Sequence, residues 1–166
     1  PKQIHFAPHI ADRTKMKKEM GKSMERIKIG MVGSQFAAHL HLNSLSKLRG
    51  SKVEVVAVVS RNRANAENFA RKFNIPDAYD DYRYILDRKD VDVVDLCIPT
   101  DLHEAFSIKA AEAGKHIICE KPLTGYFGKE RKEDQIGFTV SKKLMLKEAL
   151  KGCDRVLKAV KKNKVK

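Results

Sequence analysis

The chain has 166 residues, of which 42% are hydrophobic and 33% are charged, and it contains no Trp, 9 Gly and 5 Pro. This length and composition fit one folded domain or part of a longer protein, and they exclude disordered, collagen-like and low-complexity chains. The longest apolar runs, such as Val55–Val59, fall far short of the roughly 20 residues that span a bilayer. We therefore expect a compact soluble fold without a membrane role.

The formal net charge of +13 is distributed unevenly along the chain. Residues 1–28 carry a net charge of +5 and residues 129–166 carry +8, whereas basic and acidic side chains balance over residues 29–128. A nucleic-acid-binding module concentrates its basic residues, interleaved with aromatics, on the folded element that docks. The neutral centre therefore argues against specific nucleic-acid binding, and residues 1–24 are interpreted as a basic N-terminal extension.

The three cysteines, Cys97, Cys119 and Cys153, form no CxxC pair, and two of them lie inside apolar runs typical of strands. A buried thiol in such a run behaves as a small hydrophobe. We therefore expect no metal site and a reducing, cytoplasmic setting.

From residue 25 onward, the hydrophobic pattern alternates between strands and helices. Strands apolar on both faces belong to parallel sheets that helices cover on both sides. Residues 25–166 are therefore predicted to form a Rossmann-like, doubly wound parallel α/β sheet. The predicted strands are Ile27–Val32, Val53–Val59, a short piece at Ala78–Tyr79, Val93–Ile98 and His116–Cys119, and the predicted helices are Phe36–Leu48, Ala64–Phe73, Tyr82–Leu86 and Leu102–Ala113.

Three further expectations concern helix ends and the C-terminal part. Asp101 and Glu104 have capping-box spacing, which places the turn Pro99–Thr100 at the carboxyl end of a strand. Thr124–Val140 is charged and aperiodic, which predicts a loop. An apolar stripe then recurs at helical spacing from Leu146 to Val160, which predicts a helix covering the sheet. Lys164–Lys166 resembles the start of another strand.

The first candidate site is the turn after the first strand, Gly33-Ser34-Gln35-Phe36-Ala37-Ala38. A dinucleotide fingerprint needs a first glycine for the tight turn, a second for close approach of the pyrophosphate, and a small third residue for packing. Gly33 and Ala38 fit this pattern, and Gln35 does not. Taken alone, the pattern fits a plain structural turn equally well.

The second candidate is the end of the second strand, where an adenosine ribose would bind. Glu54 lies 21 residues beyond Gly33, but it opens the strand and is therefore far from the ligand edge. The carboxyl end carries Ser60-Arg61-Asn62-Arg63 without an acid. Because a guanidinium binds phosphate well, this turn favours a 2′-phosphate, and NADP is slightly preferred over NAD.

The third candidate is Glu120-Lys121-Pro122, directly after the strand His116–Cys119. Charged groups at the end of a buried strand must be paired or face a ligand, because burying an unpaired charge is costly. A surface salt bridge closed by a proline is the alternative interpretation.

Together, these features make Ile27–Leu123 resemble the nucleotide-binding domain of the Gfo/Idh/MocA (glucose–fructose oxidoreductase/inositol dehydrogenase) family. The resemblance rests on the turn at Gly33, Ser60-Arg61, Ile98-Pro99-Thr100-Asp101-Leu102-His103 and, most specifically, Glu120-Lys121-Pro122. The family usually has Gly where this chain has Gln35 and Asn where it has Thr100.

The resemblance implies a role for each matched segment. Gly33, Ser34, Gln35, Phe36 and Ala37 would line the diphosphate, Ser60 and Arg61 the adenosine ribose, and Pro99, Thr100 and His103 the nicotinamide side. Glu120 and Lys121 would lie beside the nicotinamide and the substrate, with Lys121 as the catalytic residue. His41 falls where the family often has His, and a packing or N–H bonding role is expected for it.

The resemblance further implies an NAD(P)-dependent oxidoreductase acting on a sugar, polyol or related hydroxyl or carbonyl compound. The family's second, substrate-binding domain is not among these 166 residues, so we expect the chain alone to be catalytically incomplete. A homo-oligomer is compatible with the sequence. The alternative is a stand-alone dinucleotide-binding sensor or interaction module without catalysis.

Overall fold

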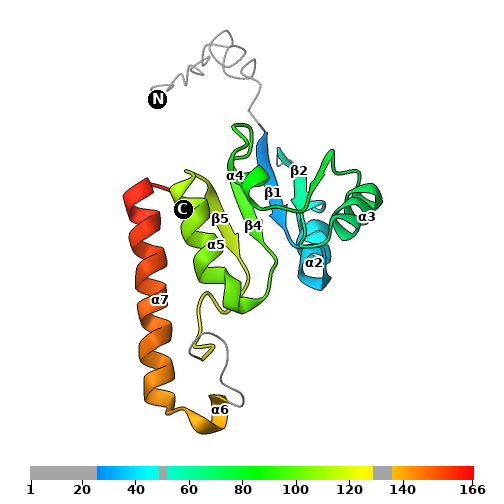
Figure 1. Cartoon of the computed structure of the whole chain (residues 1–166). Helices are drawn as coiled ribbons and strands as arrows, with labels where there is room; N and C mark the ends of the chain where they lie inside the picture. The colour runs from blue at the N-terminus through cyan, green and yellow to red at the C-terminus, as the bar shows by residue number, and fades with distance from the viewer. Residues whose placement is uncertain (1–25, 49–51, 129–135) are drawn as a thin grey trace, which may run out of the picture.

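The computed structural model describes residues 26–48, 52–128 and 136–166. The predicted extension over residues 1–24 lies outside these ranges. Five parallel strands form one sheet in the order β3-β2-β1-β4-β5 (Figure 1), which confirms the predicted fold class. The strands are β1 (Ile27–Val32), β2 (Val53–Val59), β3 (Asp77–Tyr79), β4 (Val93–Leu96) and β5 (His116–Cys119).

Helices cover the two faces of this sheet, and alternate strand residues point to opposite faces. Met31 and Cys97 belong to a buried cluster with α2 and α3, whereas Val32 and Leu96 belong to a second cluster with α4 and α5. The helices are α2 (Phe36–Leu45), α3 (Arg63–Phe73), α4 (Arg83–Leu86), α5 (Thr100–Glu112), α6 (Ile136–Thr139) and α7 (Lys142–Asn163). The core therefore consists of two apolar layers, one on each side of the sheet.

The predicted capping box at Asp101 and Glu104 is wrong. Pro99 is the N-cap residue of α5, no side chain caps the helix, and Thr100 is already helical. Glu104 instead accepts hydrogen bonds from the Arg155 guanidinium at 2.5 and 3.1 Å. The side chain that resembled a local cap therefore holds a neighbouring helix.

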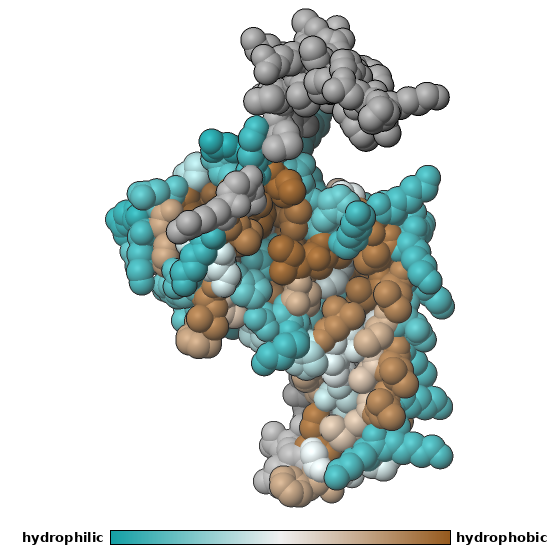
Figure 2. All heavy atoms as spheres, turned by 180° about the vertical axis from the view of Figure 1, so that it is seen from behind, coloured by the Kyte–Doolittle hydropathy of each residue, from teal (hydrophilic) through white to brown (hydrophobic). Residues whose placement is uncertain are grey.

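That neighbour, α7, packs against α5 and not directly on the sheet, contrary to the sequence expectation. Gly152 allows the close approach, since a Cβ atom there would lie 2.6 Å from Glu104 Oε2 on α5 and 3.2 Å from the Thr124 side chain. Because α5 already lies against β4 and β5, α7 leaves part of its apolar stripe uncovered. Figure 2 shows apolar side chains along this helix. Leu146, Leu150 and Leu157 of α7 are 60%, 56% and 48% exposed.

The predicted loop Thr124–Val140 contains the one-turn helix α6, which buries none of its residues and so leaves no apolar period in the sequence. Residues 129–135 lie outside the described part. No strand is assigned at Lys164–Lys166, although the Ile117 N–H donates to the Lys166 carbonyl at 2.8 Å. None of the described helices has the length and apolar composition needed to cross a membrane.

Candidate functional site

The segments that directly follow four of the strands meet at the carboxyl edge of the sheet. The register aligns Val32 with Val59 in β2 and with Leu96 in β4, and Leu96 with Cys119 in β5. Because parallel strands end at the same edge, the turns after them are neighbours, as in other doubly wound sheets. These segments contain Gly33, Ser34, Gln35, Phe36, Ala37, Ser60, Arg61, Pro99, Thr100, His103, Glu120 and Lys121.

Gly33 makes the turn after β1 because a side chain has no room there. Its φ is 108°, and a Cβ atom would lie 2.1 Å from the Cys97 carbonyl oxygen. Its N–H donates to the Val59 carbonyl at 2.8 Å. The turn therefore packs closely against the end of β4 and is hydrogen-bonded to β2. These contacts place the start of α2 at the carboxyl edge of the sheet.

The N-terminus of α2 has no side-chain cap. Gln35 is the N-cap residue, its side chain makes no capping hydrogen bond, and the first turn holds no acidic residue. Phe36 is exposed beside it. Helix N-terminal N–H groups carry a partial positive charge and bind phosphate groups. This arrangement suits a diphosphate even though Gln35 replaces the fingerprint's second glycine.

A hydrogen bond joins the turns after β1 and β2, because Ser34 Oγ donates to Ser60 Oγ at 3.0 Å. The two arginines of the second turn differ. Arg63 Nε lies 2.8 Å from Glu67 Oε1, whereas the exposed Arg61 guanidinium makes no hydrogen bond or ion pair with any described residue. Arg61 is therefore the arginine available to an anion at this turn.

Glu54 lies at the amino end of β2, opposite Lys28, and pairs with Arg26 at 3.5 Å. It is therefore remote from the edge, as its position in the sequence required.

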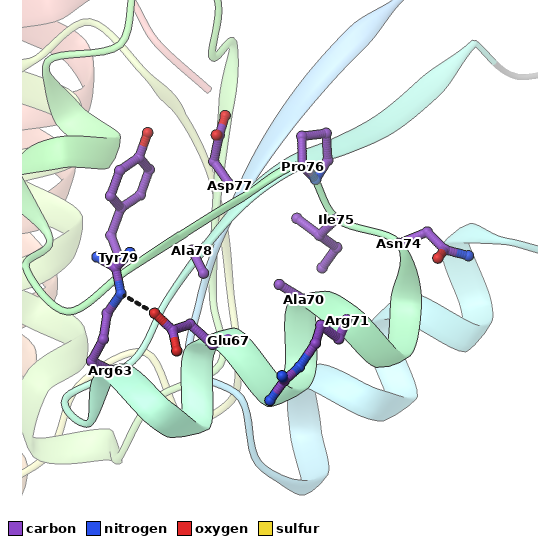
Figure 3. Close-up of a pocket in the computed structure, with 10 residues that line it drawn as sticks. All are labelled: Arg63, Glu67, Ala70, Arg71, Asn74, Ile75, Pro76, Asp77, Ala78 and Tyr79. Carbon is purple, nitrogen blue, oxygen red and sulfur yellow. Dashed lines mark hydrogen bonds and ion pairs between the residues drawn. The ribbon is translucent and has the colours of Figure 1, made fainter.

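Two hollows flank α3. The smaller, of about 200 Å³, lies between α2 and α3 and includes Ser34 and Gln35 in its wall. The larger, of about 660 Å³, runs between α3 and β3 beside the Arg63–Glu67 pair (Figure 3). It contains none of the predicted site residues, so we do not assign it to the site.

His103, which is only 1% exposed, contacts the segment after β4 from the protein interior. Its Nδ1 lies 2.8 Å from the Pro122 carbonyl oxygen and its Nε2 lies 2.9 Å from the Ile98 carbonyl oxygen. Both ring nitrogens are thus engaged by backbone, and His103 connects the segments after β4 and β5. We infer that it shapes the edge from within, while Pro99 and Thr100 lie nearer to solvent.

Glu120 and Lys121 follow β5 and behave differently from each other. Glu120 Oε1 lies 2.9 Å from His41 Nε2, and Glu120 Oε2 accepts the Lys121 backbone N–H at 3.0 Å. Lys121 itself is exposed. Glu120 is thus paired with a histidine on α2, and no ion pair between Glu120 and Lys121 is found among the described residues.

His41 also contacts β4 through its other nitrogen. Nδ1 lies 2.9 Å from Asp95 Oδ1 and 3.3 Å from Cys97 Sγ. Asp95 is 1% exposed. Sequence reasoning did not single out Asp95, although a lone acid inside the apolar run Val93–Ile98 was a usable signal.

The charges of this group follow from its contacts. Burial opposes protonation of His41, but the hydrogen bond to Glu120 and the charge of Asp95 outweigh it, so the pKa of His41 is raised. Burial also raises the pKa of Asp95. The hydrogen bond from His41 lowers the pKa of the partly buried Glu120. Burial raises the pKa of the Cys97 thiol, which stays protonated.

Atoms of His41, Asp95 and Cys97 lie within 4.8 Å of one another, close enough to surround a metal ion. In the structure, however, they are hydrogen-bonded among themselves, with the Cys97 thiol donating to Asp95 Oδ1 at 3.6 Å. A metal would have to displace protons from His41 and from a thiol of raised pKa. The arrangement is therefore interpreted as a hydrogen-bonded cluster.

We expect Gly33→Ala to destabilise the chain by roughly 2–4 kcal/mol, because backbone strain and overlap with Cys97 act together. Gly114→Ala is the control, since Gly114 also has a positive φ of 72°, but a Cβ atom added there would have no neighbour within 4 Å. It should cost only about 1 kcal/mol. Urea unfolding measures both losses, and equal losses would refute the role given to the Cys97 contact.

Stability should also depend on the charge of His41. A raised folded-state pKa means that the stabilisation is fully present below the ordinary value of 6.5 and is lost as the pH rises through the folded value. The difference in unfolding free energy between wild type and His41→Gln should thus be largest below pH 6.5, on the order of 1 kcal/mol, and should shrink toward higher pH. A difference that grows with pH would mean that the neutral ring is the stabilising form.

Comparison with known proteins matches the part of the chain that forms the sheet and its carboxyl edge. The model of the GFO_IDH_MocA family, an oxidoreductase family with an NAD-binding Rossmann fold, matches residues 27–131. The dTDP-3,4-didehydro-2,6-dideoxy-alpha-D-glucose 3-reductase of Saccharopolyspora spinosa is 39% identical over 99 residues, which cover 59% of this chain and 29% of the reductase.

Two solved structures are similar over 60% of this chain. A 3-ketoreductase from Actinomadura kijaniata, in complex with TDP-benzene and NADP, has a TM-score of 0.56 and 34% identity, with 31% of its own chain covered. A levoglucosan dehydrogenase in complex with NADH has a TM-score of 0.52 and 33% identity, with 28% covered. The chain thus spans about three tenths of the length of these proteins.

The matched residues run from β1 past the end of β5 and so include every strand of the sheet described above. The chain therefore belongs to the Gfo/Idh/MocA oxidoreductase family and contains its NAD-binding Rossmann fold.

Proposed function

We propose that this chain is the dinucleotide-binding part of an NAD(P)-dependent oxidoreductase that acts on a sugar, polyol or related hydroxyl or carbonyl compound. The observation that carries the proposal is the convergence, at one sheet edge, of an uncapped helix N-terminus, an arginine with no partner among the described residues, and Glu120-Lys121. The substrate class is supported by relatives named as a glucose-derivative 3-reductase and a levoglucosan dehydrogenase.

Each part of the dinucleotide has residues of suitable chemistry. The diphosphate would lie at the N-terminus of α2, against the backbone of Gly33–Ala37. The adenosine ribose would lie at Ser60 and Arg61. The nicotinamide would lie between Pro99–Thr100 and Glu120–Lys121, where the two remaining strand ends meet.

The bound nicotinamide supplies the hydride chemistry, and the protein supplies orientation and acid–base groups. Lys121 is the proposed catalytic residue because its ammonium is exposed at the edge while its backbone N–H is held by Glu120. An exposed ammonium can hydrogen-bond a substrate oxygen and stabilise negative charge that develops there. Glu120, held ionised by His41, would keep that edge balanced in charge.

The same geometry favours NADP. An NAD-selective site places a carboxylate at the end of β2, which bonds the ribose hydroxyls and repels a 2′-phosphate. Ser60 provides no such repulsion, and the Arg61 guanidinium, which has no partner among the described residues, can bind the phosphate. The two solved relatives carry NADP in one case and NADH in the other, so they are compatible with either cofactor.

Titration of NADP and NAD against the chain tests this proposal. Wild type should bind NADP at least as tightly as NAD. Arg61→Ala should lower the affinity for NADP about tenfold to a hundredfold and leave that for NAD nearly unchanged, because a charge-assisted hydrogen bond is lost.

Arg63→Ala is the matched control, since Arg63 follows Arg61 by two positions but is already paired with Glu67. It should change neither affinity. An equal loss for both cofactors in Arg61→Ala, or a clear wild-type preference for NAD, would show that Arg61 stacks on the adenine and does not bind the 2′-phosphate. No binding of either dinucleotide would overturn the proposed function itself.

A further inference from the structure

His41 is the one described side chain that bridges α2, β4 and the segment after β5. Its Nδ1 lies 2.9 and 3.0 Å from the two oxygens of Asp95, and its Nε2 lies 2.9 Å from Glu120 Oε1. The three residues are far apart in the sequence and come together only through the parallel register of β1, β4 and β5.

The contacts specify how the bridge works. Both imidazole nitrogens face carboxylate oxygens, and an ionised carboxylate can only accept hydrogen bonds. Both nitrogens are satisfied together when the ring is doubly protonated, so that one positive charge lies between two negative ones. The two bonds are then charge-assisted, which makes them shorter and stronger than neutral ones.

Asp95 makes the ring rigid. A carboxylate that is 1% exposed has a large desolvation cost unless it is paired. The Cys97 thiol donates to Asp95 Oδ1 at 3.6 Å, and His41 provides the positive charge. The pairing with Asp95 therefore holds the His41 ring in one orientation, with Nε2 directed at Glu120.

The orientation of His41 in turn fixes the Glu120 side chain. With Oε1 bonded to His41 and Oε2 accepting the backbone N–H of Lys121, both of its oxygens are fixed. The backbone from which the Lys121 side chain leaves the sheet edge is thereby fixed as well. The same helix, α2, has its N-terminus at the proposed diphosphate position and directs His41 to Glu120.

We propose that His41, held by Asp95, is a positioning residue that fixes Glu120 and thereby places Lys121 against the nicotinamide end of a bound dinucleotide. This inference rests on the proposed function. It assigns to His41 no contact with the cofactor and no part in adenosine binding. Its effect is therefore confined to the nicotinamide half of the ligand.

Because the expected effect of His41 is confined to the nicotinamide half, two ligands that differ in this half can test the proposal. NADP and 2′-phospho-ADP-ribose, which lacks the nicotinamide, are titrated against wild type, His41→Gln and Asp95→Asn. Both variants should bind NADP about tenfold more weakly and 2′-phospho-ADP-ribose within about twofold of wild type. Asp95 is buried, so a selective loss in Asp95→Asn must act through His41.

His116→Gln is the matched control. His116 is also hydrogen-bonded, accepting the Lys166 N–H at 3.0 Å, but it lies at the opposite end of β5 from Glu120. It should leave both affinities unchanged. Binding of 2′-phospho-ADP-ribose itself shows that each variant is folded. An equal loss of both ligands in His41→Gln would mean that His41 only supports the position of α2, and the proposal would fail.

A measurement without ligand separates this inference from the proposed function. Nitrogen NMR of the His41 ring, followed as the pH is raised, should show both nitrogens protonated up to a higher pH in wild type than in Asp95→Asn. A wild-type ring that becomes neutral below pH 6.5 would contradict the bridge. Binding of one equivalent of Zn²⁺ that is lost in Cys97→Ser would make the cluster a metal site and would also overturn it. If wild type binds no dinucleotide while the ring is doubly protonated, the proposed function alone has failed.

Discussion

The parallel register of β1 with its two neighbours is the constraint on which the site depends. β1 lies between β2 and β4, so the position of Val32 sets where both neighbouring strands end. A shift of one residue would exchange the faces of every side chain on the shifted strand. It would turn Asp95 away from α2 and move the Cys97 carbonyl from the gap left by Gly33. One register therefore determines both the turn that is proposed to bind the diphosphate and the support beneath Glu120.

Electrostatics at this edge combine exposed and buried groups. The exposed cations, Arg61 and Lys121, are available to a ligand, and the N-terminus of α2 adds a partial positive charge between them. The carboxylate nearest to Lys121 is engaged by His41, which keeps it from neutralising the ammonium directly. The desolvation cost of the buried Asp95 carboxylate is offset by its ion pair with His41. The edge can thus present positive charge to an anionic cofactor without an unpaired buried ion.

Much of this could be predicted from the sequence, for identifiable reasons. The bounds of β1, β2 and β5 are confirmed, because strands between two helical layers are apolar on both faces. The positions of Gly33, Ser60 and Glu120-Lys121 at one edge followed from the same pattern. The start of α5 was misplaced because Pro99 serves as the N-cap residue and Asp101 is already helical. The partner of α7 was wrong because an apolar stripe shows that a face is buried but not which element covers it.

The His41–Asp95–Glu120 bridge could not be predicted from local pattern. It joins residues separated by 54 and 79 positions, and no spacing rule connects them. The Arg63–Glu67 pair follows the i,i+4 spacing of a helix, but the sequence prediction began this helix at Ala64 and so left Arg63 outside it. Tertiary structure decides which charged groups are already paired and which remain available to a ligand.

NMR mapping of bound NADP on the isotopically labelled chain tests the central claim most directly. We predict that amide resonances shift at the ends of β1, β2, β4 and β5, including those of Gly33, Ser60, Thr100 and Lys121. Residues of the hollow between α3 and β3, such as Asn74 and Ile75, should not shift. Shifts confined to that hollow, or absent from the turn at Gly33 and from Lys121, would contradict the claim.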